Sequence, residues 1–262
     1  MTRIIAIANQ KGGVGKTTTT INLAASLARA GRNVLLIDLD PQGNATMGSG
    51  IEKTELECSI YDLLTDQADF SDVVTYADAA GYEILPANAD LTAAEVALLH
   101  ADEKELILKK ILEKDKDQFA FILIDCPPSL NMLTVNALVA AGSVLIPMQC
   151  EYYALEGLTA LSETISAIAE RFNPSLEIEG ILRTMYDPRN RLTLDVSEQL
   201  KEHFGAKVYR TVIPRNIRLA EAPSYGLPVM VYDKASRGAL AYIALAGEIL
   251  RQYALEEDQR EK

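Results

Sequence analysis

Residues 9–18 combine the residue types that bind phosphate. They read Asn-Gln-Lys-Gly-Gly-Val-Gly-Lys-Thr-Thr and join an apolar run, 3–8, to a helical pattern that begins at Lys16. Glycines let backbone N–H groups surround a phosphate, and a helix start adds partial positive charge. Here Lys16 is expected to reach the β- and γ-phosphates of a nucleotide and the Thr17 hydroxyl to bind Mg²⁺. A tight turn with incidental lysines is the alternative.

Three carboxylates stand at or just after the ends of other apolar runs. Asp38 ends the run 33–38 and is followed by Asp40, and Asp125 ends the run 119–125. Two carboxylates near Mg-ATP can hold metal-bound water or orient the attacking water. Asp125 has the layout of a Walker B carboxylate, projected from a sheet edge toward Mg²⁺. A helix-capping role is the alternative for the first two.

The ends of two later strand-like runs carry residues suited to a base. An adenine needs an apolar wall and an amide that reads its edge. The candidates are Thr184, Met185, Pro214, Arg215 and Asn216. A plain turn is the alternative for Pro-Arg-Asn.

These residues need a scaffold that brings strand ends together, and the hydrophobic pattern predicts one. Short apolar runs alternate with helical patterns, which indicates a parallel sheet covered on both faces. The predicted strands are 3–8, 33–38, 82–87, 119–125, 143–148, 178–185 and 207–214. The predicted helices are 16–30, 91–113, 131–141, 154–172, 192–204 and 236–253. In the second helix Thr92 and Glu95 have the spacing of a capping box.

The fold class is therefore a single α/β domain. We expect a mostly parallel twisted sheet of about seven or eight strands with helices on both faces, over residues 1–253. Residues 254–262 are expected to form a short acidic tail. Ligands of such sheets bind beyond the carboxyl ends of the strands, where the candidate residues above are found.

Composition narrows the function classes. The chain has 262 residues, 48% of them hydrophobic, and a net charge of −12. Its three cysteines (Cys58, Cys126, Cys150) stand far apart, which fits a reducing cytosol. The chain has only two histidines, which exclude multi-histidine metal sites. No apolar run has the length of a membrane span and no signal peptide is evident.

Basic residues are concentrated in one part of the chain. Residues 183–237 hold ten basic and six acidic residues, a local excess that permits an anion-binding face.

A second lysine gives the phosphate loop a distinctive form. The standard pattern places glycine six residues before Lys16, but Gln10 occupies that position and Lys11 follows it. Lys11 is placed to reach outward, toward a neighbour's nucleotide. The segment KGGVGKT is a variant Walker A motif and resembles the ParA/MinD family of P-loop ATPases. The segments 34–46, 121–138, 180–191 and 213–229 resemble ParA/Soj chromosome-partition proteins, so the likeness covers about residues 3–250.

The resemblance implies a P-loop ATPase with ATP and Mg²⁺ as cofactors. It implies that Asp40 serves hydrolysis together with Lys11 and Lys16, with Asp38 as a metal-side or structural partner. The implied metal ligands are Thr17, Asp40 and Asp125. The implied nucleotide contacts are Lys11, Gly12, Gly13, Val14, Gly15, Lys16, Thr17, Thr18, Asp40, Met185, Pro214 and Asn216.

The resemblance also implies partners. It implies an ATP-dependent homodimer, non-specific binding of double-stranded DNA through Arg189 and Arg218, and a ParB-type protein that stimulates hydrolysis. Glu151 could meet the partner's loop across such a dimer. A cytoplasmic, nucleoid-associated protein with no membrane partner is expected.

Two other readings share the scaffold. A MinD-like membrane-cycling regulator needs a basic amphipathic C-terminal helix, but this chain ends LRQYALEEDQREK. A metabolic or iron–sulfur assembly ATPase needs substrate-specific residues or paired cluster cysteines. Cys126 is therefore expected to be a packed small residue.

Overall fold

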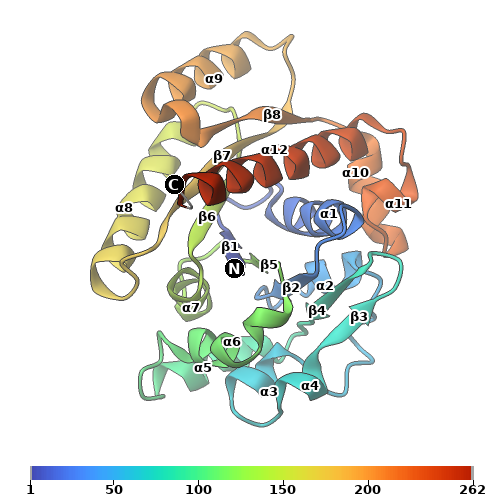
Figure 1. Ribbon diagram of the computed structural model, residues 1–262, viewed down its shortest axis with the longest axis vertical. Coiled ribbons are helices and arrows are strands. Elements are labelled where there is room, and N and C mark those ends of the chain that lie inside the picture. The colour runs from blue at the N-terminus through green and yellow to red at the C-terminus, as the bar shows by residue number, and fades with distance from the viewer. Residues whose placement is uncertain (1, 261–262) are drawn as a thin grey trace.

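The apolar runs of the sequence form one eight-stranded sheet in the computed structural model, which describes residues 2–260. The strand order is β3-β4-β2-β5-β1-β6-β7-β8, and Figure 1 shows the arrangement. Every neighbouring pair is parallel except β3 and β4. The strands are β1 (Arg3–Ile7), β2 (Val34–Asp38), β3 (Thr75–Ala77), β4 (Tyr82–Leu85), β5 (Phe121–Asp125), β6 (Ser143–Gln149), β7 (Glu177–Tyr186) and β8 (Val208–Pro214).

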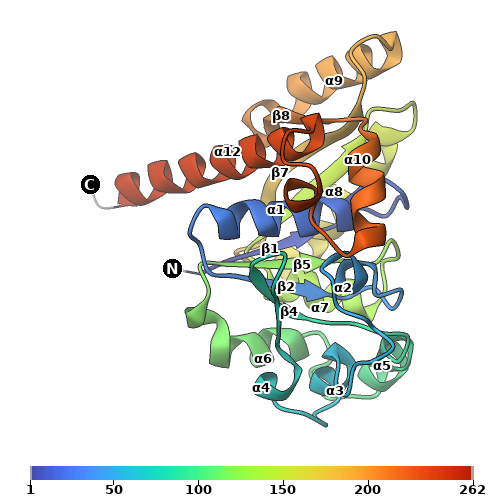
Figure 2. The ribbon, with the colours of Figure 1, turned by 90° about the vertical axis from the view of Figure 1, so that its right-hand side faces the viewer.

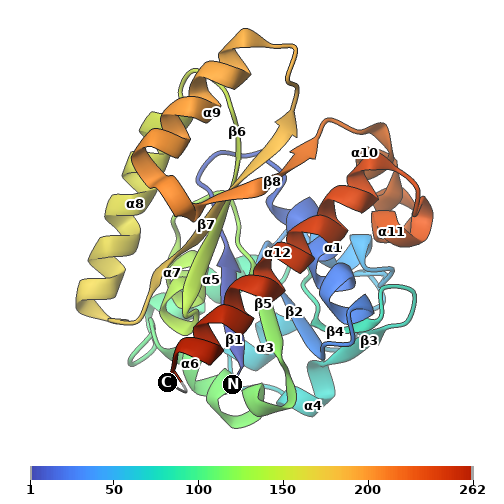
Figure 3. The same cartoon turned by 45° about the horizontal axis from the view of Figure 1, so that its top comes forward.

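Helices cover both faces of the sheet, as Figure 2 shows from the side. One face packs against α1 (Lys16–Arg29) and α12 (Arg237–Arg260), which lie next to each other in Figure 3. The opposite face packs against α3 (Ile60–Leu64), α4 (Phe70–Val73), α5 (Leu91–Leu99), α6 (Ile107–Asp115), α7 (Met132–Ala140), α8 (Ala154–Arg171) and α9 (Arg191–Phe204). Because both faces are buried, the central strands are apolar throughout, which explains their continuous hydrophobic runs.

Short helical segments fill the connections. They are α2 (Asn44–Gly48), α10 (Ile217–Glu221), α11 (Val229–Tyr232) and the 3₁₀ turns η1 (Lys116–Gln118), η2 (Gly205–Lys207) and η3 (Ala222–Tyr225). The sequence pattern predicted none of them, because they are too short to show a helical period.

The predicted α/β class and the mostly parallel sheet are confirmed. The eighth strand is β3, whose three residues form an antiparallel edge. Such a short edge strand carries too little apolar pattern to be recognised from the sequence.

The single helix predicted over 91–113 is wrong. The chain forms α5 and α6 with an irregular stretch between them, in which Glu103 has a φ of +48°. The buried side chain of Asn136 stabilises this break, because its amide donates to the Lys104 carbonyl (2.7 Å) and its oxygen accepts the Leu108 N–H (3.1 Å). A tertiary contact therefore overrides the helical period of this segment.

The capping box predicted at Thr92 and Glu95 is also wrong. The N-cap residue of α5 is Asp90, two residues earlier. The Glu95 carboxylate instead accepts a hydrogen bond from the amide of Asn131, the N-cap residue of α7. Glu95 thus joins two helices rather than closing the start of its own.

The last helix continues beyond its predicted end. Helix α12 includes residues 254–260, which the sequence pattern assigned to the tail. Residues 261–262 of that predicted tail lie outside the described residues.

Candidate nucleotide-binding site

The loop between β1 and α1 has the backbone that a phosphate cradle requires. Gly13 and Gly15 have φ values of +74° and +89°, a region that residues with a side chain rarely adopt. Gly15 is also the N-cap residue of α1, and no side chain caps this helix end. The N–H groups of the first turn therefore face the loop, where an anion can accept their hydrogen bonds.

Lys16 begins α1 and is buried, with 7% of its surface exposed. Its ammonium lies 3.4 Å from the carbonyl oxygen of Lys11 in the same loop. Burial lowers the pKa of Lys16, and the nearby Asp125 carboxylate partly opposes this effect. A buried ammonium beside open backbone N–H groups is well suited to hold an anionic phosphate.

Asp125 ends β5 directly beneath this loop. Its carboxylate accepts hydrogen bonds from the hydroxyls of Thr17 (2.7 Å) and Thr20 (3.0 Å). Complete burial, with the Asp38 carboxylate nearby, raises the pKa of Asp125 to about 8. The Thr17 hydroxyl and the Asp125 carboxylate are the hard oxygen donors that Mg²⁺ prefers, so this pair fits a magnesium ion.

The two carboxylates after β2 have different surroundings. Asp38 is fully buried and accepts hydrogen bonds from the N–H and hydroxyl of Thr46, both 2.8 Å, and from the Asp40 N–H at 3.1 Å. Its contacts are those of a structural partner that fixes the start of the next loop. Asp40 is only partly buried and accepts the Gln42 N–H at 3.0 Å.

A hollow of about 300 Å³ opens over the loop. Its lining residues are Gly12, Gly13, Gly15, Lys16, Thr17, Thr18, Asp40, Asn44, Pro128 and Met185. The sequence predicts most of these side chains around a triphosphate and its metal. Asn44, the first residue of α2, is an addition that only the folded chain brings here, and Pro128 lies three residues after Asp125.

A second, more apolar hollow of about 230 Å³ adjoins the first and shares Gly15, Thr18 and Met185 with it. The other lining residues are Thr184, Ile213, Pro214, Arg215, Asn216, Leu219, Ala220 and Tyr242. The five residues predicted for a base therefore all meet here. The sequence does not predict the part of the wall that comes from α10 (Leu219, Ala220) and α12 (Tyr242), because these helices reach the site only through tertiary packing.

Asn216 and Met185 have defined conformations at this hollow. The side-chain oxygen of Asn216 caps α10 by accepting the Arg218 N–H at 3.0 Å, so its amide nitrogen can serve a ligand. Met185 has a φ of +49°, a conformation that costs energy in a residue with a side chain. Thr184 anchors the strand end to the phosphate loop through a 2.8 Å hydrogen bond to the Val14 carbonyl.

Lys11 does not line the phosphate hollow. Its ammonium forms an ion pair with Glu151, two residues beyond β6, and both side chains are about half exposed. Its backbone N–H donates to the Asn9 side chain, which in turn donates to the Pro147 carbonyl at 2.8 Å. The side chain of Lys11 thus extends toward Glu151, while the side chain of Lys16 faces the hollow.

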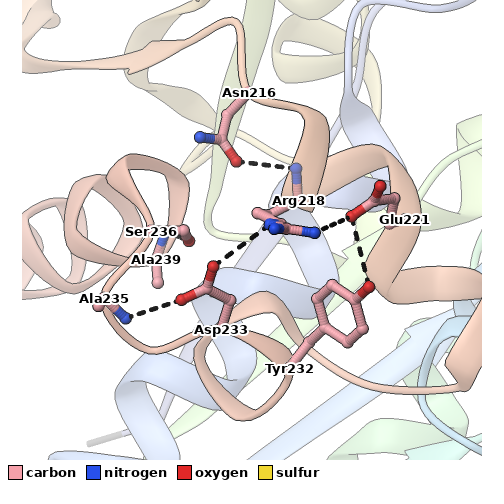
Figure 4. Close-up of polar contacts among 8 residues, drawn as sticks. All are labelled: Asn216, Arg218, Glu221, Tyr232, Asp233, Ala235, Ser236 and Ala239. Atoms are coloured by element: carbon pink, nitrogen blue, oxygen red, sulfur yellow. Dashed lines mark hydrogen bonds and ion pairs between the residues drawn. The ribbon is translucent and has the colours of Figure 1, made fainter.

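The two predicted DNA contacts lie outside the nucleotide hollows, and each is held by acidic residues. Arg189 is highly exposed and forms two hydrogen bonds with Asp187, of 2.9 and 2.8 Å. Arg218 pairs with Glu221 at 2.7 Å and lies 3.4 Å from Asp233, as Figure 4 shows. A phosphate that binds either guanidinium must compete with these carboxylates.

Cys126, which follows Asp125, is buried as a packed small residue. Burial and the Asp125 charge raise the pKa of its thiol far above the usual range. The thiol is therefore protonated and unreactive at neutral pH.

A phosphate cradle beside an apolar hollow, at the carboxyl edge of a parallel sheet, places this chain among the P-loop nucleotide-binding proteins. The AAA domain family model (AAA_31) matches residues 2–178. The sporulation initiation inhibitor protein Soj of Bacillus subtilis is 52% identical over 249 residues, covering 95% of this chain and 98% of that protein. The chromosome partitioning protein ParA of Caulobacter vibrioides is 48% identical over 262 residues, covering 99% and 97%. The chain belongs to the ParA/Soj family of chromosome-partitioning ATPases.

Solved structures agree with this fold. Cobyrinic acid a,c-diamide synthase from Mycobacterium smegmatis, solved with bound ADP and magnesium, has a TM-score of 0.85 at 38% identity, covering 97% of this chain and 96% of that one. The cell division ATPase MinD from Pyrococcus furiosus has a TM-score of 0.80 at 28% identity, covering 96% and 100%. The same scaffold therefore carries proteins with different names and different roles.

Proposed function

We propose that this chain is a Mg²⁺-dependent ATPase that dimerises on ATP, binds DNA without sequence preference and drives chromosome or plasmid segregation. The observation that carries the proposal is the pair of loop lysines. Lys16 is buried against the phosphate hollow, whereas Lys11 projects away from it to Glu151. One loop thus offers one cation to its own nucleotide and another to a neighbour.

Within one chain, the residues have separate tasks. Lys16 and the loop N–H groups hold the β- and γ-phosphates, and the adjoining apolar hollow with Asn216 holds adenine. Thr17, Asp125 and Asp40 hold Mg²⁺, which neutralises phosphate charge when bound. Asp40, which lines the hollow, orients the attacking water as the general base.

Between chains, Lys11 acts in trans. Two chains close face to face, and each Lys11 exchanges its Glu151 contact for the other chain's triphosphate. There the ammonium stabilises charge that develops as the phosphate leaves, as an arginine finger does, with an effect of about 10³–10⁵ on rate. The site is then complete only in the dimer.

Dimerisation also accounts for DNA binding by an acidic chain. Arg189 and Arg218 of both chains come to lie on one particle, so weak contacts combine through multivalency. A ParB-type partner stimulates hydrolysis and thereby releases DNA. This cycle would place the protein on the nucleoid.

The proposal is tested by DNA retention with ATP, ADP or no nucleotide over a range of salt. ATP alone should give retention, and Lys16→Ala should abolish it together with ATP binding. Retention that is independent of nucleotide would contradict the proposal. A metabolic ATPase on the same scaffold, the main alternative, predicts a turnover rate that DNA and a ParB-type partner leave unchanged.

A membrane-cycling role, the MinD-like alternative, would require a helix that binds the bilayer surface. Across residues 2–260, no helix combines the length and apolar character needed to cross a bilayer. Sedimentation with anionic liposomes in the presence of ATP provides the direct test.

A further inference from the structure

Two neighbouring tyrosines project from the loop after β6. The side chains of Tyr152 and Tyr153 are 75% and 71% exposed, more than any other large apolar side chain within residues 2–260. Their rings are 5.0 Å apart and nearly perpendicular, an edge-to-face contact that favours a fixed arrangement. The chain therefore presents a preformed aromatic surface at this point.

The position of this surface connects it to the second lysine. Tyr152 and Tyr153 directly follow Glu151, whose carboxylate pairs with the Lys11 ammonium. Consecutive Cα atoms are about 3.8 Å apart, so the tyrosines begin within a few ångströms of the group that contacts Lys11. A molecule that receives Lys11 therefore comes close to the loop after β6.

We propose that Tyr152 and Tyr153 are the aromatic anchor of the contact between two copies of this chain. The inference rests on the dimer of the proposed function and names the residues that hold it together. In a two-fold dimer both chains use the same patch, so two aromatic pairs become buried at once. Tyrosine is among the residues that contribute most at such interfaces.

The charge of the chain explains why an apolar anchor is needed. Each copy has a net charge of −12, so long-range electrostatics oppose self-association. The exchange of Lys11 gives up its half-exposed ion pair with Glu151 to make another ion pair, so it adds little net attraction by itself. Burial of aromatic surface supplies the missing attraction, and it depends little on salt.

The absence of tryptophan from the chain provides a direct test. Tyr153→Trp introduces a single fluorescent reporter, read as the emission maximum and as iodide quenching, while light scattering reports the mass. With the non-hydrolysable analogue AMPPNP, we expect a blue shift and a several-fold loss of quenching at the protein concentrations where the mass doubles. ADP should cause neither change.

Matched variants separate an anchor from a general surface effect. Tyr152→Ala and Tyr153→Ala should each raise the dimer dissociation constant about ten-fold or more, with ADP affinity of the single chain unchanged. The control residue is Tyr76, which is 57% exposed on β3 at the far edge of the sheet. Tyr76→Trp should show no shift, and Tyr76→Ala should dimerise as the parent does.

Each other outcome overturns the inference in a recognisable way. If the mass doubles but the reporter at 153 stays open to iodide, the anchor is wrong while the dimer stands. If no dimer forms with AMPPNP, the proposed function fails as well. If only DNA or a ParB-type partner shields the reporter, the tyrosines serve that partner instead.

Discussion

Replacing Asp125 by asparagine tests whether the carboxylate that we propose binds Mg²⁺ destabilises the folded chain when no nucleotide is bound. Asp125 is fully buried, with Asp38 opposite it on the neighbouring strand. Because burial raises the pKa of Asp125 to about 8, the folded chain retains a proton that the unfolded chain releases near pH 4. The contribution of protonated Asp125 to the free energy of unfolding is therefore fully present below about pH 4, and it is lost as the pH rises through about 8.

The size of the effect follows from the same shift. One pKa unit corresponds to about 1.4 kcal/mol, so a rise from 3.8 to about 8 sets an upper limit near 6 kcal/mol. The hydroxyls of Thr17 and Thr20 already lower the pKa within that shift, and the asparagine variant loses part of their hydrogen bonding, which reduces its gain. We expect Asp125→Asn to exceed the parent in free energy of unfolding by about 1–3 kcal/mol near pH 8, without nucleotide.

Urea unfolding of both proteins between about pH 4 and pH 8 measures the difference directly. The advantage of the asparagine variant should grow with pH and almost disappear at the acidic end. Mg-ADP should stabilise the parent and have much less effect on the variant. An asparagine variant that is less stable by the same amount at every pH would refute the reasoning.

Three further predictions concern single residues. Asp40→Ala should retain ATP affinity and ATP-dependent DNA retention but lower single-turnover hydrolysis about 100-fold or more. Gly50→Ala and Gly81→Ala both place a side chain at positive φ, +85° and +78°, costing about 1 kcal/mol in urea unfolding. Gly50→Ala should cost about 1–3 kcal/mol more, because its Cβ would lie 2.9 Å from a facing carbonyl oxygen, whereas position 81 has no atom within 4 Å. Arg189→Ala or Arg218→Ala should each reduce the salt slope of DNA binding by a dimer by about 1.8, equally for unrelated sequences, and an unchanged slope would remove that arginine from the interface.

The parts of the site that depend on strand ends could be predicted from the sequence. Asp38, Asp125 and the loop before Lys16 each follow a short apolar run, and parallel strands bring such ends to one edge. The pattern is local, so no tertiary information is needed to place these residues together.

Features that depend on tertiary contacts could not be predicted. The break between α5 and α6 is set by Asn136, which lies more than twenty residues further along the chain. The ion pair of Lys11 with Glu151 joins residues 140 positions apart, and the sequence predicts for Glu151 only a contact with a partner's loop. The contact between Arg218 and Asp233 is also tertiary, since Asp233 reaches Arg218 from beyond α11.

The central claim is that Lys11 of one chain completes the site of the other. It is tested most directly by mixing Lys11→Ala chains with Asp40→Ala chains, each inactive alone. In a mixed dimer, the site that retains Asp40 receives Lys11 from its partner, so an equal mixture should recover about a quarter of the parent ATPase rate with random pairing. If the mixture forms mixed dimers but stays inactive, the lysine acts within its own chain and the account is contradicted.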